Sequence, residues 1–106
     1  TVMDDEKPRL VKSLADKNIL ILRNHGLLVG GRSIPEAFQT MWGLQRACEV
    51  QVATDASGKT SIPINDEVLA KTAQLLNLQA MGGPAGGLEF DALTRVIAKI
   101  DPSYKE

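Results

Sequence analysis

The chain contains one histidine, His25, and it lies in a turn between two apolar runs. The runs are ILIL, residues 19–22, and LLV, residues 27–29, and the turn between them reads RNHG. Imidazole is the commonest metal ligand in proteins and carries protons near neutral pH. A catalytic zinc usually takes three protein ligands, so one histidine does not make a zinc site. From residue types alone, His25 is either a structural histidine or one member of a site completed by residues elsewhere.

Other patterns that suggest chemistry have simpler explanations. Cys48 falls on the apolar stripe of a predicted helix, where a thiol normally packs and is inert. The stretch SGKT, residues 57–60, ends like a phosphate-binding loop, but Ala53 stands where that loop has its first glycine. The glycine pairs within residues 82–87 lack the spacing of a dinucleotide-binding motif. The sequence therefore predicts no nucleotide or organic cofactor site.

Composition narrows the class of protein. The 106 residues carry twelve basic and thirteen acidic side chains, a formal charge of -1, without a basic block to neutralise a nucleic-acid backbone. The apolar runs are far too short to span a bilayer, and the acidic N-terminus is unlike a signal peptide. A single cysteine suits a reducing compartment. We expect a cytoplasmic protein that binds neither nucleic acid nor membrane, and a start at Thr1 suggests an incomplete chain.

The segments around His25 predict a helix and a hairpin. Apolar residues at helical spacing within residues 4–18 favour an amphipathic helix that ends near Asn18. The two apolar runs are typical of buried strands. Asn24 and Gly26 tolerate the left-handed conformations of a tight reversal, so we expect an antiparallel hairpin with His25 at its tip.

A long helix is predicted to follow the hairpin. Ser33 with Glu36 three residues later forms a capping-box pattern, and Pro35 suits a first helical turn. Apolar residues then recur every three or four positions from Ile34 to about Thr54.

Two more helices complete the prediction. Asn65 or Asp66 is suited to cap the first of them, and the run MGGPAGG ends it. Residues 82–87 are expected to form a flexible Gly-rich connection. The last helix covers residues 88–100 and ends before Pro102, because a residue that precedes proline avoids helical angles.

The stretch KNILILRNHGLLVGGRSIPEAFQTMWGLQRACEVQ, residues 17–51, resembles the second half of the class II aldolase/adducin head domain. That family has a strand, an N-H-G turn, a strand and a long helix with an E-A-F start and an A-C-x-x-Q stretch. GGLEFDALTRVIAKIDPSY, residues 86–104, is similar to the C-terminal helix and tail of adducin-like members, and LQRACEVQ leans to the same branch. The resemblance implies an α/β fold in which residues 1–106 form the C-terminal half of an α/β/α sandwich.

The resemblance also implies a site. The family's enzymes are zinc-dependent aldolases, epimerases and related lyases that commonly form tetramers. The histidine of the N-H-G turn is their third zinc ligand, which corresponds to His25; the other two come from an earlier H-x-H motif that this chain lacks. Some members use a tyrosine of the C-terminal tail as a proton donor in a neighbouring subunit's site, and Tyr104 is the candidate here.

Three functional hypotheses follow from the sequence. The first is part of a zinc-dependent lyase or epimerase acting on a small hydroxy-carbonyl or sugar-phosphate substrate. The second is a non-catalytic adducin-like head domain that serves assembly or cytoskeletal binding. The third is a truncated chain with neither activity, whose uncovered apolar faces and strand edge would drive self-association or binding of a partner fragment.

Overall fold

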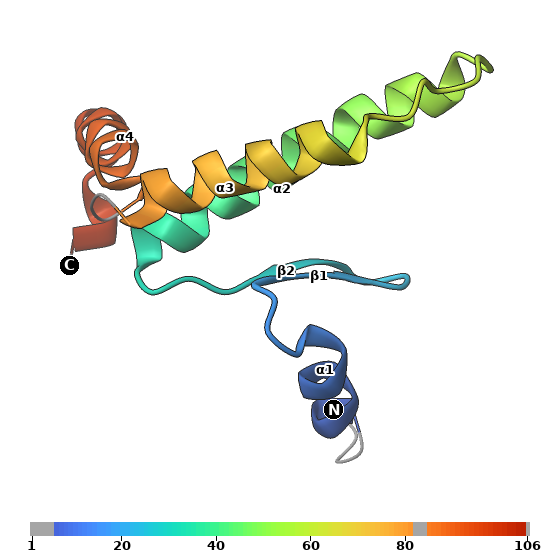
Figure 1. Cartoon of the computed structure of the whole chain (residues 1–106). Helices are drawn as coiled ribbons and strands as arrows, with labels where there is room; N and C mark the ends of the chain where they lie inside the picture. Colours follow the sequence, from blue (N-terminus) through green and yellow to red (C-terminus); the bar gives the residue numbers. More distant parts are fainter. Residues whose placement is uncertain (1–5, 82–84, 106) are drawn as a thin grey trace.

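The computed structural model describes residues 6–81 and 85–105. Its elements follow one another as α1 (Glu6–Leu14), β1 (Ile19–Leu22), β2 (Gly26–Val29), α2 (Ile34–Ala56), α3 (Asp66–Met81), α4 (Gly87–Ile100) and a 3₁₀ turn, Ser103–Lys105 (Figure 1). The expected order of helix, hairpin, long helix and further helices is confirmed. The predicted beginning of the first helix and residues 82–84 of the Gly-rich connection lie outside the described residues.

The hairpin has the predicted antiparallel register. Leu22 pairs with Gly26 next to the turn, and Ile19 pairs with Val29 at the open end. Asn24 has φ 56° and Gly26 has φ 148°, so both residues that were expected to permit the reversal adopt positive φ. The turn is closed by the N–H of His25, which donates to the carbonyl of Leu22 at 3.2 Å.

The first helix ends earlier than the sequence predicts. It stops at Leu14 instead of near Asn18, and Ala15 follows with φ 47°, in the left-handed region. The N–H of Lys17 donates to the carbonyl of Leu14 at 2.8 Å, which completes the reversal. Asn18 instead belongs to the hairpin, because its carbonyl accepts the N–H of Gly30 at 2.7 Å. The hydrogen bond with Gly30, directly after β2, therefore extends the hairpin to Asn18.

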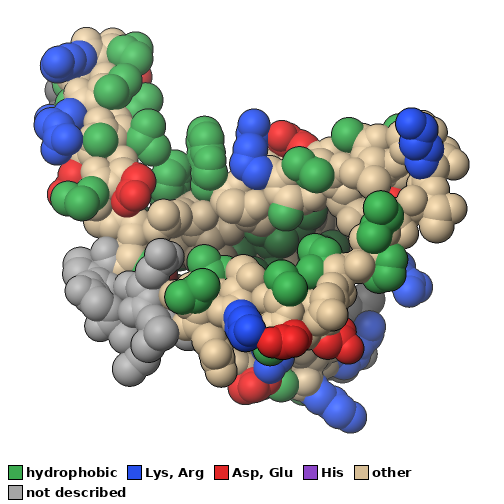
Figure 2. Space-filling model, turned by 45° about the horizontal axis from the view of Figure 1, so that its top comes forward, with side chains coloured by type: hydrophobic (Ala, Val, Ile, Leu, Met, Phe, Trp, Pro, Cys, Tyr) green, Lys and Arg blue, Asp and Glu red, His purple; other side chains and the backbone are tan. Residues whose placement is uncertain are grey.

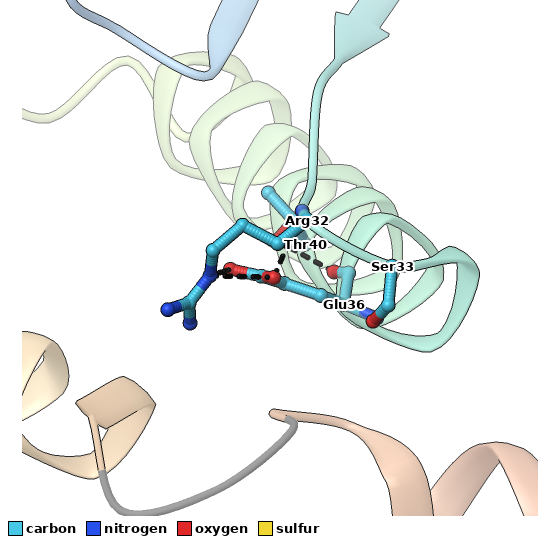
Figure 3. Close-up of polar contacts among 4 residues, drawn as sticks. All are labelled: Arg32, Ser33, Glu36 and Thr40. Carbon is cyan, nitrogen blue, oxygen red and sulfur yellow. Dashed lines mark hydrogen bonds and ion pairs between the residues drawn. The ribbon is translucent and has the colours of Figure 1, made fainter.

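Residues at the beginning of α2 form the predicted cap with one difference (Figure 3). The Ser33 hydroxyl accepts the N–H of Glu36 at 3.3 Å. The Glu36 carboxylate, however, accepts the backbone N–H of Arg32 at 2.9 Å and its Nε at 3.1 Å, one residue before the expected partner. The hydrogen bond from the Arg32 guanidinium lowers the pKa of the Glu36 carboxyl. Glu36 thus links the loop after β2 to the first turn of α2.

The ends of the remaining helices agree closely with the sequence. The Asn65 carboxamide oxygen accepts the N–H of Glu67 at 2.7 Å, which identifies Asn65 as the cap of α3. α4 begins at Gly87 and ends at Ile100, and the extended residue Asp101 stands before Pro102 as expected.

Gly86, within the predicted Gly-rich connection, is held tightly against α2. It is buried and has φ 77°. A Cβ at this position would lie 2.6 Å from the carbonyl oxygen of Pro35 and 2.9 Å from the Cβ of Gln39. The absence of a side chain thus lets the beginning of α4 approach the beginning of α2. Closer to the middle of α4, the ring of Phe90 packs edge-on against Phe38 of α2, with centroids 5.5 Å apart.

The arrangement around α2 is open. β2 and α4 pack on α2, and α1 packs on β1. The radius of gyration is 17.3 Å, whereas a compact domain of this length has about 13 Å. The accessible surface is 9342 Å², against roughly 5,800 Å² for a globular monomer of this mass. In residues 6–76 and 85–105, where the structure describes side chains, no hydrophobic side chain is fully buried, and many are exposed on the face seen in Figure 2.

These apolar surfaces are of a kind that other polypeptide normally covers. Ile21 of β1 is 69% exposed, and Trp42 of α2 is 57% exposed. Exposed apolar surface on this scale is typical of interfaces with other protein rather than of a free monomer. Among the helices that the structure describes, none is long and apolar enough to cross a membrane.

Candidate functional site

His25 lies at the tip of the hairpin, beside a cleft between the turn and α1. Its side chain is exposed. The cleft has a volume of about 230 Å³, and its polar lining comes from Glu6, Arg9 and Ser13 of α1 together with Arg23 and His25 of the turn. Leu10 and Leu22, both half-buried, supply the apolar part of the lining.

The described residues provide too few ligands to bind a metal without ligands from elsewhere. No group of three or more histidine, cysteine, aspartate or glutamate side chains that could hold a metal ion occurs in residues 6–81 and 85–105. The cleft offers one imidazole, His25, and one carboxylate, Glu6. Zinc accepts both kinds of ligand but usually requires three from protein in a catalytic site. Any zinc held by His25 therefore needs ligands from residues beyond those described.

Tyr104 lies away from His25 in the same chain. It belongs to the 3₁₀ turn after α4, near the C-terminus, whereas the hairpin turn points away from that end of the molecule (Figure 1). Its hydroxyl donates to the carbonyl of Thr94 at 3.4 Å. The ring lines an apolar pocket of about 370 Å³ between α2 and α4, together with Phe38, Trp42, Phe90, Leu93, Thr94 and Ile97. The two predicted site residues do not meet within one chain, so a shared role would require two copies.

The remaining sequence patterns have structural explanations. Cys48 is half-buried on α2, and its thiol is free. Ser57, the first residue of SGKT, caps the C-terminus of α2: its hydroxyl donates to the carbonyl of Thr54 at 2.7 Å and accepts the N–H of Lys59 at 3.2 Å. This stretch ends a helix, whereas a phosphate-binding loop precedes one.

Of the polar residues that line this cleft, the sequence pointed only to His25, and it singled out neither Arg9 nor Arg23. Arg23 directly precedes the Asn-His-Gly triplet, so its presence near His25 could have been inferred from the turn. Arg9 is 16 positions away from His25 in the sequence, and only the packing of α1 on β1 brings it to the cleft.

Comparison with known proteins places this arrangement in a family. The family model described as Class II Aldolase and Adducin N-terminal domain matches residues 2–52. A Pseudomonas aeruginosa protein named "Putative aldolase class 2 protein" is 39% identical over 104 residues, which cover 96% of this chain and 40% of that protein. Rat alpha-adducin is 37% identical over 109 residues, covering 91% of this chain and 15% of its own length.

A solved structure shares the fold. The crystal structure of an aldolase II superfamily protein from Pseudomonas syringae superposes with a TM-score of 0.81 at 34% identity, over 100% of this chain and 42% of that one. The hairpin, the long helix and the following helices thus define an aldolase II-type α/β chain. The chain belongs to the class II aldolase and adducin N-terminal domain family, and it spans about 40% of the length of the bacterial relatives that it matches.

Proposed function

We propose that the protein is a zinc-dependent lyase or epimerase of the class II aldolase type, that it acts on a small hydroxy-carbonyl or sugar-phosphate substrate, and that His25 is one zinc ligand. The observation that supports it best is the exposed imidazole at the tip of a hydrogen-bonded hairpin, next to a polar cleft. A bound zinc would supply a Lewis acid for a substrate carbonyl oxygen.

The contribution of this chain is to hold the ligand in a fixed place. The Leu22–Gly26 pair and the 3.2 Å hydrogen bond from the His25 N–H restrain the backbone on both sides of the imidazole. Gly26 has no side chain, and a Cβ there would have no neighbour within 4 Å, so the space beside His25 stays open to a ligand. Precise placement of this kind favours metal binding by a ligand set that is completed elsewhere.

A second candidate function is a non-catalytic adducin-like head domain that serves assembly. The 37% identity with rat alpha-adducin and the similarity to an adducin-related protein of Schizosaccharomyces pombe, 30% over 106 residues, favour it. The exposed apolar surface of α2 and α4 is compatible with either function, since an oligomeric enzyme would also cover it. Metal binding therefore discriminates between the two functions better than association does.

Metal analysis of the complete natural polypeptide tests the proposal. We expect stoichiometric zinc in the wild type and its loss in His25→Ala and His25→Gln. Arg95→Gln, on the exposed surface of α4, is the control and should keep its zinc. Circular dichroism establishes that each variant is folded. A wild type without zinc, or a His25→Ala variant that retains it, would instead support the adducin-like role.

A further inference from the structure

The cleft beside His25 carries an excess of positive charge. Arg9 and Arg23 line it, and among the described residues of its lining Glu6 is the one carboxylate. Arg32 and Arg46 form ion pairs with Glu36 and Glu49, but within the described part of the chain neither Arg9 nor Arg23 has an ion-pair partner. Two arginines thus line one small cleft, and no carboxylate of the described residues forms an ion pair with either of them.

Guanidinium groups in such a place are suited to an oxyanion. Each is permanently charged and offers up to five donors in a planar fork that matches phosphate or carboxylate oxygens two at a time. Ser13 adds a hydroxyl donor to the same lining. The charge and the donors of the cleft therefore complement a dianion better than a neutral sugar.

From this arrangement we infer that Arg9 and Arg23 form an anion-binding subsite beside His25, which holds the phosphate or carboxylate group of the substrate. The inference rests on the proposed function only in that His25 marks the reacting end of the substrate. The subsite selects substrates in which the anionic group lies within a few bonds of the carbonyl, because both groups occupy a cleft of about 230 Å³.

The fold explains how two distant arginines come to share a ligand. Arg23 is held by the hairpin turn, one residue after the end of β1. Arg9 is placed by the packing of α1 on β1, and the half-buried Leu10 of α1 lines the same cleft as Leu22 of β1. Both arginines are exposed and free of competing ion pairs in the described residues, so a ligand does not have to displace a carboxylate.

Calorimetric titration of the complete natural polypeptide with inorganic phosphate, and in parallel with glycolate, tests the subsite. We expect Arg9→Gln and Arg23→Gln each to weaken binding of the preferred anion at least about tenfold, since each removes charge-assisted hydrogen bonds to the anion. Arg95→Gln removes the same charge from α4 and should bind like the wild type. Arg23→Lys keeps the positive charge but loses the planar fork of donors, so its affinity for the anion should lie between those of the wild type and Arg23→Gln. Binding should also weaken as the salt concentration rises.

The outcomes separate the subsite from the proposed function. Tighter binding of phosphate identifies a phosphate subsite, and tighter binding of glycolate a carboxylate subsite, provided that Arg9 and Arg23 are required. Equal affinity in the wild type, Arg9→Gln and Arg23→Gln overturns the inference, as does an equal loss in Arg95→Gln. Zinc content, measured on the same samples, should not change with either arginine. Zinc that depends on His25 without arginine-dependent anion binding would leave the proposed function standing alone; the reverse would leave only the subsite.

Discussion

Replacement of Gly86 by alanine tests how α4 is attached to α2. Two costs arise at this residue. Alanine at φ 77° occupies the left-handed region, which costs an L-residue roughly 1–2 kcal/mol. The new Cβ would also lie 2.6 Å from the Pro35 carbonyl oxygen and 2.9 Å from the Gln39 Cβ, and such overpacking typically costs about 1–3 kcal/mol. The smaller entropy of the unfolded alanine chain returns about 0.4–1 kcal/mol. We therefore expect a destabilisation of about 2–4 kcal/mol.

Two other glycines separate the contributions. Gly58 has φ 67°, but a Cβ there would have no neighbour within 4 Å, so Gly58→Ala measures the backbone cost alone, about 1 kcal/mol. Gly43 lies within α2, has no positive φ, and has the same free space; Gly43→Ala should stabilise the helix by about 0.5–1 kcal/mol.

Urea unfolding of the complete natural polypeptide, followed by circular dichroism, gives the free energy of unfolding for the three variants and the wild type. We expect Gly86→Ala to lower the free energy of unfolding clearly more than Gly58→Ala does. A difference between the two below about 0.5 kcal/mol, the ordinary range for surface substitutions, would show that α4 does not approach α2 as described.

Four further results are expected. Ser33→Ala removes the acceptor for the Glu36 N–H and should lower the free energy of unfolding by about 0.5–2 kcal/mol in urea, whereas Ser33→Asp should restore it. Because Arg32 lowers the pKa of Glu36, the stabilisation from this carboxylate is present above the unfolded pKa and is lost as the pH falls through the folded one; the gap in Tm between wild type and Glu36→Gln should therefore close in acid. Tyr104→Phe should leave the zinc content unchanged but slow turnover if the tail donates a proton, and an unchanged kcat would exclude that role. Emission from Trp42, the single tryptophan, should shift to shorter wavelength on self-association, and a concentration-independent monomer in sedimentation would contradict coverage of the α2 face.

Local patterns predicted most of the elements correctly. The positive φ of Asn24, the cap at Ser33 and the end of α4 before Pro102 were predicted, and Asn65 was one of the two predicted candidates for the cap of α3. Each depends on backbone preferences or hydrogen bonds that act over three or four residues. The resemblance carried by the N-H-G turn was also sufficient to identify the family, which the comparisons confirm.

Such local patterns could not predict contacts between elements that are distant in the sequence. From the sequence alone, a glycine at position 86 suggests a flexible backbone. In the structure, the close approach of the Pro35 carbonyl oxygen leaves no room for a side chain at this position. The helical pattern of α1 extends towards Asn18, yet hydrogen bonding to Gly30 assigns Asn18 to the hairpin. The distance of Tyr104 from the hairpin is likewise a property of the whole fold.

The candidate site also has one part that the sequence predicted and one part that only the tertiary structure revealed. The sequence by itself determined that one imidazole stands in a tight turn between two strands, because turn chemistry is local to residues 22–26. Only the tertiary structure decided that Arg9 lines the cleft next to Arg23 and His25, since the packing of α1 on β1 sets that proximity. The physical reason is one of range: dihedral preferences are set within a few residues, whereas the convergence of charges depends on which apolar faces pack together.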